Sequence, residues 1–200
     1  MQSLRRFVSL LFLPAGLGLL LQATGVSIGA TAPVAPAIDL AHRLLALALA
    51  LFCAELARMA GVDLDNIARL KQQDPTLAEN SRLRHFHKVT ISTIVLEITG
   101  FYAALRLLPV GAIAIIFSQL WFNLLAGIQL YPNAPSPIET MGPADRKAVL
   151  LANAVGLSLM SLWFIQAARI WLSAGLLSLI VLFLLIKYGT AVGQPAQKSK

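Results

Sequence analysis

The sequence predicts an all-α, polytopic integral membrane protein with about six transmembrane helices joined by short loops. Of its 200 residues, 58% are hydrophobic and only 12% are charged, and the mean hydropathy is +0.75. Soluble domains average about 25% charged and about 45 to 50% apolar residues. The composition therefore favours a single transmembrane domain. Its polar stretches are too short to bury a core of their own.

The apolar stretch at 86–130 sets the topology. As one helix, its roughly 45 residues would be about 67 Å long, more than twice the thickness of a bilayer's hydrocarbon core. It must therefore cross twice, at 86–106 and 110–130, with a reversal near Pro109. The last apolar block is again too long for one crossing and predicts spans at 148–168 and 172–187.

Two further spans are expected before this stretch, at 7–28 and 40–59. The first follows Arg5 and Arg6, and small residues at 30–32 come shortly after it. This order is also typical of a secretory signal with its cleavage site. The apolar run is longer than a usual signal core, which favours a retained helix, and the cleaved signal stays open as an alternative.

The segment 61–85 is the main polar part of the chain and is expected to form a loop on the cytoplasmic side. Apolar residues recur between positions 62 and 70 and predict a short amphipathic piece against the membrane surface. Asp74 followed by Pro75 is typical of a helix start. We therefore expect the third helix to begin near Pro75 and to continue unbroken into the span at 86–106.

The basic residues fix the orientation of these spans. With six spans, thirteen of them fall on the side of both termini and three on the other side, so the termini are predicted to be cytoplasmic. The thirteen are Arg5, Arg6, Arg58, Arg69, Lys71, Arg82, Arg84, Lys88, Arg146, Lys147, Lys187, Lys198 and Lys200, and the three are Arg43, Arg106 and Arg169. The expected location is a bacterial plasma membrane or an equivalent organellar membrane.

Glu97 is the acidic residue expected nearest the middle of the membrane. Gln119 lies as far after the reversal as Glu97 lies before it, so the two should share one depth, with Asn123 one turn away. A carboxyl in hydrocarbon finds a partner, faces water or keeps its proton. Two hypotheses follow. The three residues form a patch that handles a proton, an ion or a polar solute, or a protonated Glu97 bonds Gln119 and joins two helices.

Two other groups of residues suggest contacts with lipid or with helices. A basic cluster next to the third span is expected to contact anionic lipid headgroups. Small residues at every fourth position of the second span predict a ridge along which another helix can approach closely. The cluster consists of Arg82, Arg84, His85, His87 and Lys88, and the ridge consists of Ala46, Ala50 and Ala54.

Signs of catalytic chemistry are missing from the sequence. His42 is predicted at the opposite membrane face from His85 and His87, so these histidines cannot share one haem iron. The single cysteine, Cys53, excludes an internal disulfide and a thiolate metal cluster. The net charge of +7 is explained by basic residues flanking apolar runs, which argues against nucleic acid as a partner. We expect no enzyme activity, no cofactor and no metal.

The function expected from these observations is that of a non-catalytic accessory, assembly or structural component of a membrane complex. Its partners would be the bilayer, with its anionic headgroups, and other membrane proteins or further copies of the chain. The alternative is a transporter or channel for a small solute, a proton or another ion, built around Glu97, Gln119 and Asn123.

Overall fold

The computed structural model describes residues 2–25, 36–130, 138–140, 146–165 and 168–192. These residues form six α-helices, a short 3-10 helix η1 and a two-stranded antiparallel ladder, so the predicted helical class is confirmed. The helices are α1 (Gln2–Ala23), α2 (Pro36–Gln73), α3 (Ser81–Ala104), α4 (Leu108–Leu125), α5 (Lys147–Trp163) and α6 (Arg169–Val192). η1 is Pro75–Ala78, and the strands are β1 (Ile128–Leu130) and β2 (Ile138–Thr140).

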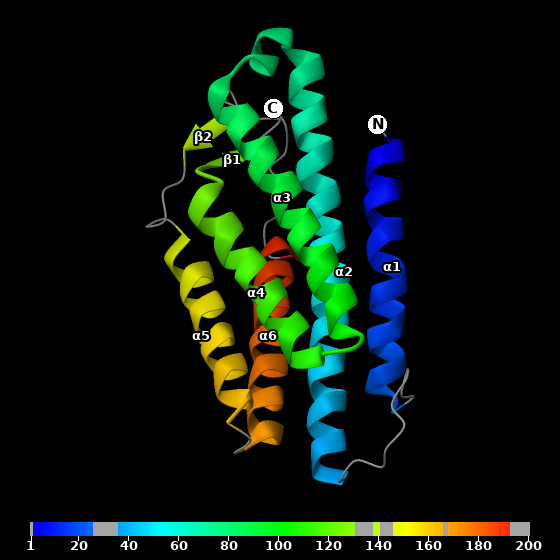
Figure 1. Cartoon of the computed structure of the whole chain (residues 1–200). Coiled ribbons are helices and arrows are strands. Elements are labelled where there is room, and N and C mark those ends of the chain that lie inside the picture. The colour runs from blue at the N-terminus through cyan, green and yellow to red at the C-terminus, as the bar shows by residue number, and fades with distance from the viewer. Residues whose placement is uncertain (1, 26–35, 131–137, 141–145, 166–167, 193–200) are drawn as a thin grey trace.

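Successive helices run in alternating directions and form an elongated bundle (Figure 1). α2 packs against α1, α3 and α6, while α4 lies between α3 and α5. η1, the ladder and the start of α3 lie toward one end, which we call the basic end. The opposite end, which we call the turn end, holds the α3–α4 reversal and the start of α6.

The α3–α4 hairpin has the reversal predicted within 86–130. α3 ends at Ala104 and α4 begins at Leu108, so the chain reverses within three residues. Two glycines let the helices approach closely. A Cβ at Gly111 would lie 2.4 Å from the Ala104 backbone nitrogen, and a Cβ at Gly100 would lie 2.8 Å from Ile115 Cγ1. The hairpin is therefore packed backbone to backbone near its turn.

The expectation of a loop at 61–85 is wrong for its first half, because α2 continues to Gln73 without a break. Leu64, Ile67 and Leu70 are buried. The last two belong to a cluster with Leu83 and Phe86 of α3, so this face packs on a neighbouring helix and not on the membrane surface. Burial of these side chains offsets the cost of a helical glycine at position 61, about 1 kcal/mol.

The third helix also begins later than the Asp74 signal suggested. The Asp74 carboxylate accepts a hydrogen bond from the Thr76 backbone at 2.9 Å, but the helix that it caps is the 3-10 turn η1. A second cap follows at Asn80, whose side chain accepts from the backbone nitrogens of Arg82 and Leu83. The chain therefore bends between two short-range caps before α3 begins.

The span expected at 110–130 is shorter than predicted. α4 ends at Leu125, and Gly127 has a φ of 69°, which takes the chain out of the helix. β1 then pairs with β2, placing Gln129 opposite Glu139. The Arg146 guanidinium donates to the Ile128 carbonyl at 2.8 Å and so ties this ladder to the start of α5.

The spans predicted at 7–28, 86–106, 148–168 and 172–187 correspond to α1, α3, α5 and α6 with ends that differ by up to five residues, whereas the span predicted at 40–59 is only part of α2. α1 ends at Ala23, and α5 ends at Trp163 ahead of the reversal that leads into α6. The last residues of the span predicted at 7–28, and positions 166–167 of the span at 148–168, lie outside the described residues. By length and composition, α1, α2, α4 and α6 are long and apolar enough to cross a membrane, and α5 is a shorter apolar helix of 17 residues.

Candidate functional site

Glu97 and Gln119 face each other across the α3–α4 hairpin. The Gln119 side-chain amide donates a hydrogen bond to Glu97 Oε1. Both residues are buried, with 3% of Glu97 and 8% of Gln119 exposed. Because the reversal is short and the helices are in close contact, residues equally distant from the turn meet at one level. The sequence spacing thus brings together the pair that it suggested.

Asn123 is the third residue of the predicted patch, and its side chain bonds to the backbone of Gln119 and not to the Glu97 or Gln119 side chain. Its amide donates to the Gln119 backbone carbonyl at 2.7 Å, one turn back on the same helix. This bond satisfies a polar group locally. The polar patch is therefore centred on Glu97 and Gln119.

A small compartment lies beside Glu97, between α2, α3 and α4. Its polar lining consists of Asp63, Thr90, Thr93, Glu97 and Gln119, and its volume is about 20 Å³. Since one water needs about 10 to 15 Å³, the compartment has room for a single water molecule.

Asp63 is the member of this compartment that sequence reasoning missed, because it was placed in a loop. α2 also contributes Leu56, Met59 and Ala60 to the lining. Positions 56, 59, 60 and 63 have the spacing of one helix face. From this spacing, the sequence could have predicted that α2 continues past the span at 40–59 and that Asp63 lies inside the bundle.

A larger cavity of about 60 Å³ lies between α2, α4, α5 and α6. Its lining is mostly apolar, with Phe52, Ile116 and Leu176 among the residues, and the amides of Gln119 and Asn153 are its polar side chains. This space therefore offers an ion no continuous polar surface.

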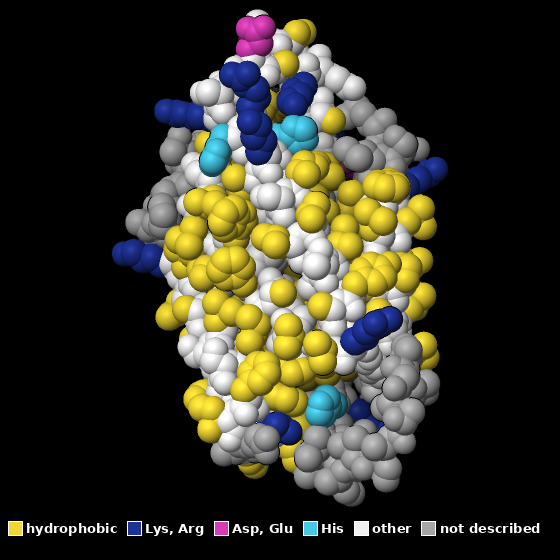
Figure 2. Space-filling view, viewed as in Figure 1, with side chains coloured by type: hydrophobic (Ala, Val, Ile, Leu, Met, Phe, Trp, Pro, Cys, Tyr) yellow, Lys and Arg dark blue, Asp and Glu magenta, His cyan; other side chains and the backbone are white. Residues whose placement is uncertain are grey.

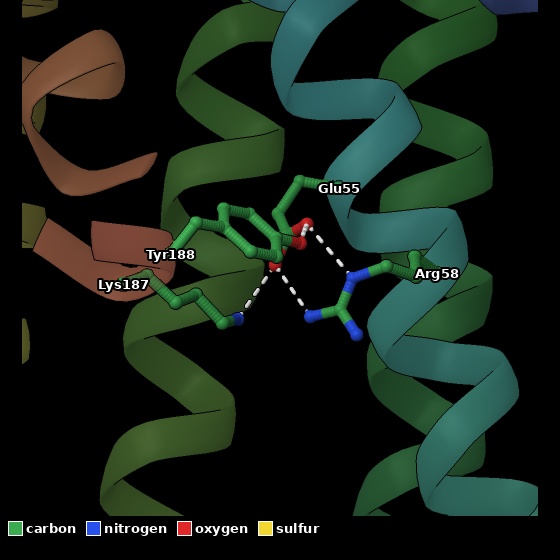
Figure 3. Close-up of polar contacts among 4 residues, drawn as sticks. All are labelled: Glu55, Arg58, Lys187 and Tyr188. Carbon is green, nitrogen blue, oxygen red and sulfur yellow. Dashed lines mark hydrogen bonds and ion pairs between the residues drawn. The ribbon is translucent and has the colours of Figure 1, made fainter. Parts of the chain in front are cut away.

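A second polar cluster ties α2 to the end of α6 (Figure 3). The Glu55 carboxylate, 4% exposed, accepts hydrogen bonds from Arg58 at 2.9 and 3.0 Å, from Lys187 Nζ at 2.6 Å and from the Tyr188 hydroxyl at 2.5 Å. Glu55 and Arg58 are three residues apart on α2, a spacing at which oppositely charged side chains on one helix face can pair. No local pattern in the sequence points to Lys187 or Tyr188, which lie more than 130 residues away.

The predicted lipid-contact cluster lies at the basic end, at the start of α3. Arg82, Arg84, His85 and Lys88 are exposed, and His85 Nε2 donates to the Leu125 carbonyl at 2.8 Å. Figure 2 shows Lys, Arg and His side chains gathered above a broad band of hydrophobic side chains. His87 is half-buried instead, with its Nδ1 3.5 Å from Lys71 Nζ.

The alanine ridge predicted on α2 divides between the interior and the surface. Ala46 and Ala50 are buried and belong to the main core, whereas Ala54 is exposed. Ala46 and Ala50 therefore allow close packing within the chain's own bundle.

His42 lies at the turn end, where its ring meets that of Trp163 at 5.1 Å, far along the bundle from His85 and His87. Within the described residues, no group of three or more His, Cys, Asp or Glu side chains is arranged to hold a metal ion.

Comparison of the chain with protein-family models, with curated proteins and with solved structures finds no match in any of the three.

Proposed function

We propose that the chain is an integral membrane protein with six spans and that it serves as a non-catalytic accessory or assembly component of a membrane complex. Four helices have the length and composition of membrane spans. α3 and α5 flank one of them, α4, and would share its depth.

The outer surface supports the membrane location. Large apolar side chains on α1, α5 and α6 are exposed to an extent that a soluble monomer avoids. They include Leu10 at 63%, Leu151 at 66%, Trp171 at 78% and Leu185 at 65%. In a bilayer these side chains would face lipid or the helices of a partner.

The distribution of basic residues supports a cytoplasmic basic end. Arg69, Lys71 and the Arg82–Lys88 cluster belong to that end, and Arg106 and Arg169 belong to the turn end. In this orientation the cluster would meet the anionic headgroups of the cytoplasmic leaflet.

The observation that carries the accessory role is the geometry at Glu97. Its carboxyl is bound by Gln119, the adjoining compartment fits a single water, and the hairpin toward the turn end is closed by the Gly100 and Gly111 contacts. A transport path would need connected space on both sides of the carboxyl. The Glu97–Gln119 pair therefore serves best to join two helices, and the chain would act through its association with partner proteins.

Purification from native membranes tests this role. The full chain, tagged and extracted in mild detergent, is expected to bring one other membrane protein at a fixed ratio, and the partner, tagged in turn, is expected to bring the chain at the same ratio. Recovery of the chain alone as a homo-oligomer, with solute or ion flux in liposomes that is lost in Glu97→Gln, would overturn the accessory role in favour of transport.

A further inference from the structure

Thr93 differs from the other hydroxyl residues of α3. Thr90 donates to the Phe86 carbonyl at 2.9 Å and Thr99 donates to the Val95 carbonyl at 2.8 Å, each one turn back along the helix. Thr93 is buried, with 4% exposed, and its Oγ1 has no hydrogen-bond partner among the described residues. A buried hydroxyl without a partner among these residues calls for one, such as an ordered water molecule.

Neighbouring contacts explain why Thr93 is left over. The Val89 carbonyl, which Thr93 would use by the same rule, accepts a hydrogen bond from the Ser92 hydroxyl at 2.9 Å. Trp121 of α4 donates to that hydroxyl at 3.3 Å. With the backbone bond of the helix, the Val89 carbonyl has both lone pairs occupied. The Thr93 hydroxyl is thereby available to the compartment that it lines.

This compartment joins Thr93 to two carboxyl groups. Asp63 of α2 is partly exposed and stands toward the basic end, and Glu97 lies deeper, one turn beyond Thr93 on α3. The space of about 20 Å³ exceeds what one water needs, and a buried water makes about three hydrogen bonds. The side chains of Thr93, Asp63 and Glu97 could together make three hydrogen bonds to one water molecule.

Beyond Glu97, toward the turn end, α3 and α4 are in close contact. The Gly100 and Gly111 contacts bring α3 and α4 together backbone to backbone toward the turn end. Asp63 is the partly exposed carboxyl that lines the compartment, so it is the group past which we expect solvent to reach Glu97.

We propose that Thr93 holds one water molecule in this compartment and that this water carries a proton between Asp63 and Glu97. In one direction, the O–H bond of the Asp63 carboxylic acid breaks and its proton passes to the water oxygen. A proton of that water then forms the O–H bond of the Glu97 carboxylic acid. The water is regenerated, and Asp63 takes a new proton from solvent at the basic end.

Charged groups around the route belong to several elements. The Asp63 carboxyl interacts electrostatically with three cations, which are Lys187 of α6, Arg146 ahead of α5 and Arg58 of α2. The Glu97 carboxyl interacts electrostatically with Asp63 and Cys53 of α2 and accepts a hydrogen bond from the Gln119 amide of α4. Two adjacent carboxyl groups in a place of low dielectric favour the state that carries at least one proton.

Infrared spectroscopy of the purified full chain tests the proposal. The carbonyl band of a protonated carboxyl group that disappears in Glu97→Gln identifies Glu97, and its shift on transfer to D₂O reports how fast water exchanges the proton. In Thr93→Val the shift is expected to be about tenfold slower, because the water loses one of its few hydrogen bonds. Asp63→Asn, which cannot pass a proton on, is expected to slow it as well.

Thr99→Val is the matched control, since it changes the same residue type on the same helix at an exposed position. It should exchange at the wild-type rate, and circular dichroism should show equal helix content in all variants. Wild-type exchange in Thr93→Val or Asp63→Asn would overturn the route. So would the absence of any Glu97-dependent band, or its loss on adding Na⁺ at constant pH, which would assign the site to a metal cation.

Discussion

Replacing Gly111 by alanine is expected to destabilise the protein, by loosening the α3–α4 hairpin, more than replacing any other glycine that the structure describes by alanine. The new Cβ would lie 2.4 Å from the Ala104 nitrogen and 2.5 Å from its Cα. These are backbone atoms, so no flexible side chain can move aside, and the helices must separate. We expect a loss of about 3 kcal/mol, measured by denaturant unfolding in mixed micelles.

Gly175→Ala is the matched control for this substitution. Gly175 follows the start of α6 after the α5–α6 reversal, as Gly111 follows the start of α4, but its added Cβ would lie 3.7 Å from Leu159 Cδ1, an ordinary contact. Because alanine favours a helix over glycine by about 1 kcal/mol, this variant should be as stable as the wild type or slightly more so. Equal stability of the Gly111 and Gly175 variants would contradict the close packing at the turn.

Replacing Glu55 by alanine is expected to release the end of α6 from α2. Glu55 is the shared acceptor for Arg58, Lys187 and Tyr188, so its loss leaves two cations close together with no carboxylate between them. Removing one partner of a fully buried pair costs about 3 to 5 kcal/mol. Arg58 and Lys187 are 41% and 30% exposed, so we expect about 2 kcal/mol after allowing for solvent screening.

The same unfolding assay checks the Glu55 prediction, with Lys187→Ala beside it. That variant should cost less, because Glu55 keeps Arg58 and Tyr188 as donors. In Glu55→Ala, Lys187→Ala should add little further loss, since its partner is already gone. Full additivity of the two single effects would show that the Lys187–Glu55 contact does not stabilise the bundle.

The sequence predicted those features that follow from length and local spacing. The apolar stretch at 86–130 exceeds one bilayer crossing, which led directly to the hairpin and to the level shared by Glu97 and Gln119. The Glu55–Arg58 ion pair is a local contact of the same kind, since the two residues are three apart on one helix.

The remaining features depend on contacts between distant segments. Polar residues made 61–85 look like a loop, and only the packing of Ile67 and Leu70 against Leu83 and Phe86 shows why α2 continues. That continuation moved Asp63 into the compartment of Glu97. Lys187 reaches Glu55 across a separation of 132 residues, which no local pattern reports.

The six-span topology is the central claim, and labelling of single cysteines tests it most directly. The sole cysteine, Cys53, is first replaced by alanine, and Glu79→Cys at the basic end or Leu107→Cys at the hairpin turn is then introduced; both positions are exposed. In intact cells of a bacterial host, an impermeant maleimide is expected to label Leu107→Cys alone, and Glu79→Cys only after permeabilisation. Labelling of both positions in intact cells, or of Glu79→Cys alone, would contradict the topology.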